Sequence, residues 1–206
     1  MPAHPEIVLR SNDDNRDLRR HIASLEMQLR TIEIESRQLT ARWQDIERKN
    51  GALANLYVAI HQLHGTLVRA EVVEALTEIL VGLIGSEMLA VFERGDHGAS
   101  FRLIGSFGID AYDYRELSAS DDSLGRLLAS GVRYVAGEPH ALAGELEMPI
   151  AAALPLRFDG RVTGGIVLFS LLAHKRGFDD VDYDLFDLLT THAAIALRCT
   201  GGEVRA

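Results

Sequence analysis

Apolar residues recur at alternating spacings of three and four along residues 18–67. One heptad assignment makes every d position apolar: Leu18, Leu25, Ile32, Leu39, Ile46, Leu53, Ile60 and Leu67. Its a positions are mixed: Ile22, Leu29, Ser36, Trp43, Asn50, Tyr57 and His64. Such spacing, sustained over about seven heptads, is typical of a coiled coil rather than of a helix on a globular core. A helix of this size is roughly 75 Å long at about 1.5 Å per residue. No other segment predicts a helix to match it, so we expect the partner to be a second copy of the chain.

Asn50 is the residue that most restricts how two such helices pair. A polar residue at an a position fixes the register and favours two strands, at some cost in stability. In a parallel pair, Arg42 of one chain meets Glu47 of the other, and exposed pairs of this kind contribute about 0.5 kcal/mol each. We therefore predict a parallel homodimer, and the sequence leaves an antiparallel one open. The predicted dimer interface consists of Leu18, Ile22, Leu25, Leu29, Ile32, Leu39, Trp43, Ile46, Asn50, Leu53, Tyr57 and Ile60.

The start of the predicted long helix is marked by residues that commonly cap a helix N-terminus. Ser11, Asn12 and Asp13 are possible N-caps, so we expect residues 1–12 to be flexible and the coiled coil to occupy residues 13–67.

Near its C-terminal end the seam becomes more polar, with His64 at the last a position. Paired His64 side chains in a dimer would respond to pH near about 6.5 or to a metal ion. The simpler interpretation is a tolerated polar seam residue, and we predict no metal site.

A second stripe of helical period begins where the seam ends. The next seam positions, Glu71 and Glu74, are charged, so the heptad fails after Leu67. The apolar face of this second helix ends just before Gly85, and glycine is typical of a helix C-terminus. The face consists of Val72, Val73, Leu76, Ile79, Leu80, Leu83 and Ile84. The long helix should therefore pass into a core-facing helix near residues 68–70, where any signal between the two would cross.

The rest of the chain predicts an α+β fold with an antiparallel sheet flanked by helices. Apolar runs at 88–93 and 100–107 predict one hairpin. The dipeptide Asp159-Gly160 predicts a tighter one, because it allows positive φ in a short turn. Gly164 and Gly165 indicate a bulge or a close helix crossing. The other expected elements are a loop at 108–122, a helix at 123–130, strands at 132–136, 152–158 and 161–171, a loop at 137–149 and a final helix ending at 198.

Charge is unevenly distributed along the 206 residues. The net charge is −9, and residues 51–206, with 12 basic and 21 acidic side chains, carry all of it. This excess argues against nucleic acid or an anionic membrane as a partner. The only cysteine, Cys199, excludes an internal disulfide. No stretch resembles a signal peptide or a membrane span of about 18 apolar residues, so we expect a cytoplasmic protein, of a bacterial type.

Four stretches occur in an order and spacing known from one family. They are LHGTLVRAEVVEALTEILVGLIGSEMLAVFE, SLGRLLASGVRYVAGE, LPLRFDGRVTGGIVLFS and FDDVDYDLFDLLTTHAAIAL, and they cover roughly residues 63–198. On these stretches the domain resembles a GAF domain, a small sensory module related to PAS. The resemblance places a GAF-like domain at 68–199, followed by a flexible tail at 200–206.

The resemblance also implies a ligand pocket between the sheet and two variable loops, at residues 106–121 and 137–150. The lining candidates are Phe107, Tyr112, Tyr134 and His140. The alternative is ordinary core packing for the aromatic residues and a solvated loop for His140.

Motifs of common catalytic sites are absent from the sequence. It contains no G-x-S-x-G turn, no G-x-x-x-x-G-K phosphate loop, no H-E-x-x-H pair and no C-x-x-C. The acidic run 179–184 resembles the start of a calcium loop, but Leu185 stands where the turn glycine is needed. Caps of the final helix explain these carboxylates better. We therefore predict no catalytic residue and name no cofactor.

Related enzymes and pigment-binding relatives differ at their cysteines. GAF-like reductases of free methionine sulfoxide and bilin-binding relatives depend on loop cysteines, whereas Cys199 lies at the end of the final helix. The N-K-x-n-F-x-x-x-D-E pattern of cyclic-nucleotide-binding relatives is also missing.

Two functions remain open at this point. The first is a homodimeric regulatory protein, not an enzyme, that senses a small ligand or docks a signalling partner and acts in trans. The alternative is a degenerate GAF scaffold that binds no ligand and assembles a complex through its coiled coil and acidic surface. Neither function involves nucleic acid or a membrane.

Overall fold

The computed structural model describes residues 5–95, 97–140, 142, 144 and 146–200. The chain falls into two compact units, Met1–Gly51 and Ala52–Ala206. The first unit is helical throughout its described residues, and the second contains the sheet. The flexibility predicted for residues 1–4 and 201–206 concerns positions outside the described residues.

The long helix α1 (Pro5–His64) includes the predicted seam up to its last a position. It begins before residues 11–13, so the N-caps that we expected lie inside the helix. A proline in the first helical turn loses no hydrogen bond, because the first N–H groups have no intrahelical acceptor. Residues 5–12 are therefore helical. None of the helices in the described part of the chain is long and apolar enough to cross a membrane.

A short turn separates α1 from α2 (Arg69–Ile79). The chain bends at Gly65, and Val68 has an extended backbone and caps α2. The Thr66 hydroxyl accepts a hydrogen bond from the Val68 N–H at 3.0 Å. The passage predicted near residues 68–70 therefore lies at this turn.

The core-facing stripe predicted after the seam is confirmed. It extends from α2 into η1 (Leu80–Ile84), a π-helical turn that follows without a break. Gly85 ends the segment with a φ of 73°, in the left-handed region that glycine enters readily. The buried residues of the stripe are Val72, Leu76, Ile79, Leu80 and Ile84.

One six-stranded antiparallel sheet forms the centre of the second unit, in the order β3-β2-β1-β6-β5-β4. Its strands are β1 (Ser86–Arg94), β2 (Ser100–Phe107), β3 (Glu116–Ser118), β4 (Tyr134–Val135), β5 (Ala152–Phe158) and β6 (Arg161–Leu171). The predicted α+β fold with an antiparallel sheet is confirmed. The edge strand β3 lies inside the segment that we predicted to be a loop, because three residues with one buried side chain give no alternating pattern.

A bulge in β2 explains why its apolar residues do not alternate. Val91 of β1 pairs with Gly105, whereas the next residue, Phe92, pairs with Leu103. Ile104 is therefore the extra residue, and side chains before and after it change faces.

The consecutive glycines Gly164 and Gly165 of β6 mark both features that the sequence suggested, a bulge and a close helix crossing. The register of β5 and β6 shifts beside Gly164, which marks a bulge. A Cβ at Gly165 would lie 2.4 Å from Leu128 Cδ2 of α3 (Ser123–Ala129), which marks a close helix crossing.

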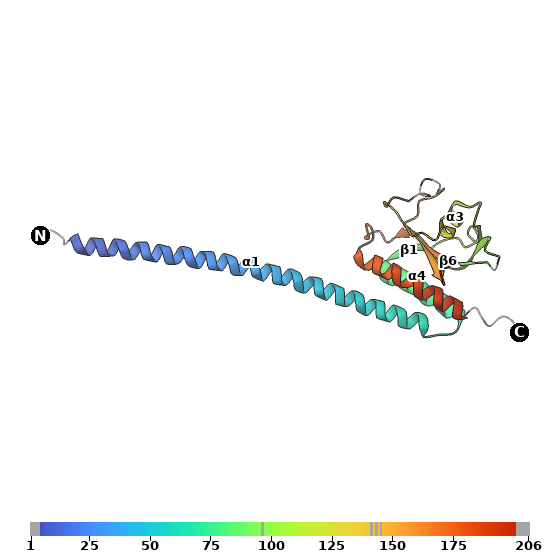
Figure 1. Ribbon diagram of the computed structural model, residues 1–206, viewed down its shortest axis with the longest axis horizontal. Coiled ribbons are helices and arrows are strands. Elements are labelled where there is room, and N and C mark those ends of the chain that lie inside the picture. The colour runs from blue at the N-terminus through green and yellow to red at the C-terminus, as the bar shows by residue number, and fades with distance from the viewer. Residues whose placement is uncertain (1–4, 96, 141, 143, 145, 201–206) are drawn as a thin grey trace. The chain divides into compact units, whose positions relative to one another are not determined.

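Helices cover both faces of the sheet. On one face, α2, η1 and α4 (Asp180–Thr200) pack with the end of α1, while α3 and the two loops pack on the other. Figure 1 shows α4 and α3 on opposite sides of the sheet. Ala59 and Leu63 of α1 have no exposed surface. The second unit therefore includes the last turns of α1, which we had assigned to the coiled coil.

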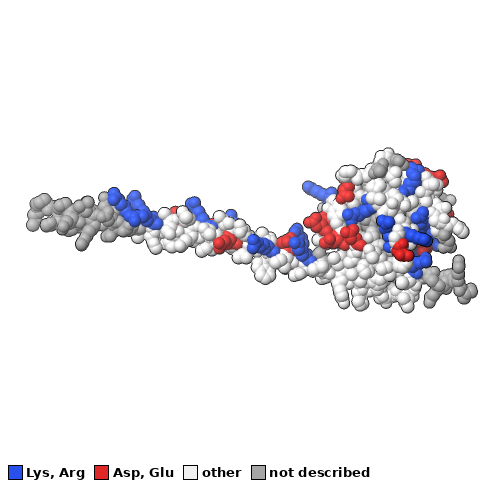
Figure 2. Space-filling view, in the orientation of Figure 1, with Lys and Arg blue, Asp and Glu red and all other residues white. Residues whose placement is uncertain are grey.

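The two charge signs are distributed differently over the two units. Figure 2 shows basic and acidic side chains interspersed along α1, whereas acidic side chains gather over the first turns of α4. Asp179, Asp180 and Asp184 are exposed there. The acidic excess found in the sequence is thus partly concentrated at one helix end.

Candidate functional site

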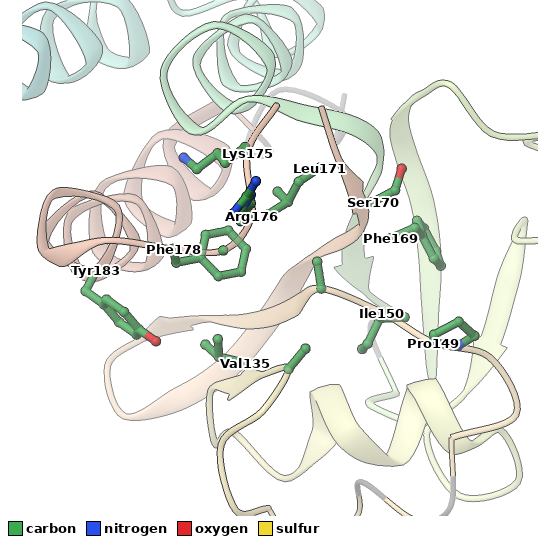
Figure 3. A pocket seen from close by; sticks show the side chains of 13 residues that line it. Val135, Pro149, Ile150, Phe169, Ser170, Leu171, Lys175, Arg176, Phe178 and Tyr183 are labelled. Carbon is green, nitrogen blue, oxygen red and sulfur yellow. The ribbon is translucent and has the colours of Figure 1, made fainter. Parts of the chain in front are cut away.

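A cavity of about 570 Å³ opens beside the ends of β4, β5 and β6, where the chain enters α4. Its walls come from β4 and β6, from the segment 149–151 just before β5, from the loop between β6 and α4, and from α4 itself (Figure 3). The cavity thus joins segments that are far apart in the sequence. The residues that define its chemistry are Ile150, Phe169, Ser170, Arg176, Phe178 and Tyr183.

Aromatic rings fix one wall of this cavity. The Phe178 and Phe186 rings are edge to face, with centroids 4.9 Å apart and planes at 71°. Tyr183 packs against the same Phe186 ring at 5.9 Å. Phe186 has no exposed surface, so two cavity-lining rings rest on a core side chain. Such ring pairs contribute about 0.5–1.5 kcal/mol beyond area burial.

Two neighbouring cations at the cavity have different roles. Lys175 Nζ lies 2.6 Å from Asp182 Oδ1 and 2.5 Å from the Ile84 carbonyl oxygen. Its positive charge is therefore paired with a carboxylate of the protein. Arg176 is exposed and makes no hydrogen bond or ion pair with any described residue. The Ser170 hydroxyl is buried and likewise has no hydrogen-bond partner among these residues. The cavity therefore offers, beside apolar walls, a cation and a hydroxyl that have no partner in the described part of the chain.

The four residues predicted to line a pocket do not line this cavity. Phe107 is 47% exposed and Tyr112 is 74% exposed. The Arg115 guanidinium lies 5.2 Å from the Tyr112 ring centroid. Tyr134 and His140 form an edge-to-face pair with centroids 5.5 Å apart. The structure thus brings two of the candidates together and leaves the other two at the surface.

Side chains of the two predicted loops pack on the sheet face where we expected a ligand. Tyr114, from the first loop, packs on Phe169 with ring centroids 5.0 Å apart. Its hydroxyl donates a hydrogen bond to Met148 Sδ of the second loop at 3.0 Å, and burial raises the pKa of Tyr114. Leu142 and Leu146 pack against the same apolar cluster. Tyr114 therefore links both loops to the sheet.

A second cavity, of about 420 Å³, lies between the residues that flank β4, the strand β5 and the middle of α4. Its charges are largely paired: Arg133 lies 2.8 Å from Asp187. The Tyr183 hydroxyl donates a hydrogen bond to Glu138 at 2.7 Å, and this bond is the main cause that raises the pKa of Tyr183. These contacts hold β4 and its following loop against α4.

Two of the acidic residues at the start of α4, Asp179 and Asp182, cap the helix, as predicted. Asp179 Oδ1 accepts hydrogen bonds from the Val181 and Asp182 N–H groups at 3.0 Å and 3.1 Å. Asp182 Oδ2 accepts one from the Asp179 N–H at 2.9 Å. This reciprocal arrangement is a capping box. In the described part of a single chain, no group of three or more His, Cys, Asp or Glu side chains is placed to hold a metal ion.

The predicted dimer-interface residues are exposed along α1. In the first unit, the apolar seam residues from Leu18 to Ile46 are each between 48% and 69% exposed. In the second unit, Leu53 is 63% and Tyr57 is 70% exposed, while Ile60 is partly buried. The pairing of these residues with a second chain stays a prediction.

Sequence reasoning missed the cavity and its cation. The segment 175–178 places two basic residues and an aromatic one directly before the cap of α4. That local sequence is a usable signal, although its neighbours in the cavity, Ile150 before β5 and Phe169 in β6, come from distant parts of the chain.

Comparison with known proteins supports the fold. A family model for the GAF domain matches residues 69–199. The GAF domain from an Acinetobacter phosphoenolpyruvate-protein phosphotransferase has a TM-score of 0.60 at 12% identity, covering 76% of this chain and 98% of that chain. The GAF domain of the corresponding Coxiella burnetii protein has a TM-score of 0.55 at 15% identity, covering 71% and 92%. No curated protein sequence matches the chain.

An enzyme is also among the similar structures. The free methionine-R-sulfoxide reductase from Neisseria meningitidis, solved with its substrate, has a TM-score of 0.55 at 16% identity, covering 72% of this chain and 89% of that chain. At such low sequence identities, the similarity to these solved structures shows only that the fold is shared. The family match runs from the start of α2 to the end of α4, so it covers the whole sheet. The resemblance inferred from the sequence is confirmed, and the chain belongs to the GAF domain family.

Proposed function

We propose that this GAF domain protein is a homodimeric, cytoplasmic signalling protein whose α1 seam joins two copies in parallel. GAF domains in general have regulatory roles, and that general role extends to this member of the family. In this proposal, the state of the domain changes the packing of α1, and a partner protein reads the change.

One observation carries the proposal: near its end, α1 keeps the seam residues Leu53 and Tyr57 exposed on a different face from the residues that it buries in the domain. Ala59 and Leu63 are fully buried in the domain core. Leu53 and Tyr57, at d and a positions, are 63% and 70% exposed. Since successive residues are about 100° apart around a helix, these two sets lie on separate faces. The same helix therefore has room for a second copy while it holds the domain.

Polar contacts support a route from the sheet to the end of α1. Arg69, the first residue of α2, forms an ion pair with Glu93 of β1 at 2.6 Å. Its guanidinium also donates a hydrogen bond to the Leu197 carbonyl of α4 at 3.0 Å. A displacement of β1 or α4 would thus act on the turn that follows α1.

Light scattering of the full chain at micromolar concentration tests the dimer. The proposal requires twice the mass of one chain. Cysteine crosslinking at position 46 separates the orientations: a parallel pair crosslinks through identical positions, whereas a monomer, or a dimer without that crosslink, would contradict the proposal.

We further propose that the signal is a small anionic ligand with an apolar body, bound in the cavity of about 570 Å³. Arg176 supports this assignment because its charge is unpaired among the described residues. Phe169 and Phe178 supply apolar contact for the rest of the ligand. A thermal-shift series with aromatic and short-chain carboxylates tests it: stabilisation should be lost in Arg176→Gln and retained in Arg161→Gln, an exposed site outside the cavity.

A ligand-free scaffold is the second candidate, and the contact of Tyr114 with Phe169 favours it. That contact occupies the sheet face where a ligand was expected, at a ring separation of 5.0 Å. The scaffold would assemble a complex through α1 and the acidic start of α4. No stabilisation by any carboxylate or nucleotide, together with a stoichiometric protein partner that binds without ligand, would favour the scaffold over the sensor.

A further inference from the structure

A pair of histidines joins the end of α1 to α4. His64 Nε2 and His192 Nδ1 are 3.0 Å apart, and the ring centroids are 5.3 Å apart with planes at 79°. His64 is exposed and His192 is partly exposed, so solvent reaches the pair. Both residues belong to the second unit. Two ring nitrogens at this separation either form a hydrogen bond or are close enough together to bind the same metal ion.

The observed separation is close to that of two metal ligands. Zn–N distances of about 2.0–2.1 Å in a tetrahedral site place two nitrogens roughly 3.3 Å apart. The separation between His64 and His192 is 3.0 Å, slightly shorter, and metal binding requires both rings to rotate so that their nitrogen lone pairs point at one ion. A neutral imidazole binds a metal through either ring nitrogen.

A single chain supplies too few ligands for a closed site. Within the described residues of one copy, no third His, Cys, Asp or Glu joins the pair. His64, however, occupies an a position of the seam, and a residues of two parallel helices face each other across the axis. A parallel dimer would therefore bring two such pairs together, with four imidazole nitrogens around the two-fold axis.

We propose that the His64–His192 pairs of two copies form one tetrahedral site for a divalent transition metal ion such as Zn²⁺. This inference rests on the proposed parallel dimer. Four imidazoles suit zinc, copper and nickel rather than calcium or magnesium, which prefer oxygen ligands. The bound ion would tie the end of α1 to α4 in both copies, at the junction through which the signal passes.

Titration of the full chain with Zn²⁺, followed by calorimetry, tests the site. We expect one ion for every two chains. His192→Gln and His64→Gln should each weaken binding by at least 100-fold, whereas His61→Gln, an exposed histidine one turn away, should not. Co²⁺ in place of Zn²⁺ should give the strong visible absorption of tetrahedral coordination, and this absorption should be lost in His192→Gln.

Light scattering in the same buffers separates the two proposals. A dimer that binds no Zn²⁺, or binds one ion per chain, would overturn the shared site and leave the dimer standing. Retained binding in His192→Gln would also overturn the site. A monomer would contradict both the site and the proposed function. Because His64 is exposed at a helix end, His64→Gln keeps the test valid if the α4 variant unfolds.

Discussion

Lys175 and Asp182 form an ion pair that joins the end of η1 to the start of α4. Lys175 Nζ lies 2.6 Å from Asp182 Oδ1, and the two side chains are 20% and 5% exposed. The ammonium also donates a hydrogen bond to the Ile84 carbonyl, at a helix end where positive charge is favourable. The other oxygen of Asp182 accepts the Asp179 N–H. One lysine therefore links two helices that cover the same face of the sheet.

Removal of this lysine should be costly. We expect Lys175→Met to lower the free energy of unfolding by about 3 kcal/mol, because the buried Asp182 carboxylate loses its counter-ion. Urea unfolding measures the change. Arg176→Met is the matched control, since the exposed neighbour should change stability by no more than about 0.5 kcal/mol. Equal effects of the two substitutions would contradict this role of Lys175.

The crossing of α3 over β6 predicts a coupled pair of substitutions. Gly165→Ala should cost about 1–3 kcal/mol, because the new Cβ would stand 2.4 Å from Leu128 Cδ2. Leu128→Ala removes that atom and leaves a cavity, which the alanine at 165 partly fills. The double variant should therefore lose at least about 1 kcal/mol less than the sum of the single losses. Strictly additive losses in urea unfolding would show that the two residues do not interfere.

Gly82 provides the control for this prediction. A Cβ at Gly82 meets no atom within 4 Å. Gly82→Ala should therefore leave stability unchanged or raise it, by up to about 1 kcal/mol.

Tyr183 should titrate above its ordinary pKa of 10.0, because its hydroxyl donates a hydrogen bond to Glu138 and burial adds to the effect. The folded-state pKa is raised, so the stabilisation is fully present below the unfolded value. It is lost as the pH rises through the higher folded-state pKa. The difference in tyrosinate absorbance between the native protein and Tyr183→Phe should show one transition with a midpoint above 10.0. A midpoint at or below that value would contradict the contact.

Local patterns were sufficient for most of the fold. Asp159 and Gly160 both adopt positive φ in the predicted tight turn, and the flanking strands have the predicted bounds. The heptad pattern likewise predicted one long helix. The strand β3 was not predicted, because it depends on tertiary contacts. Its Leu117 pairs with Phe101 of β2, and a three-residue strand is too short to show a periodic pattern.

The candidate site was less predictable than the fold. Tyr112, an aromatic residue in a variable loop, is a predicted lining residue, but it is 74% exposed and does not line the cavity. The sequence does not single out Arg176, the cavity cation that has no partner among the described residues. Its neighbours Phe169, in β6, and Ile150, just before β5, come to the cavity because β5 pairs with β6, and no local spacing encodes that pairing. Predicting this cavity from the sequence would have required the order of the strands.

The dimer seam is tested most directly by two isoleucines of similar exposure on one helix. Ile32, at a d position, is 63% exposed, and Ile34, off the seam, is 56% exposed. Light scattering of the full chain and of each Asp variant gives the mass. We predict a dimer for the native protein and for Ile34→Asp, and a monomer for Ile32→Asp, because a charge at d has no counter-ion in the seam. A native monomer, or an Ile32→Asp variant that remains a dimer, would contradict the account.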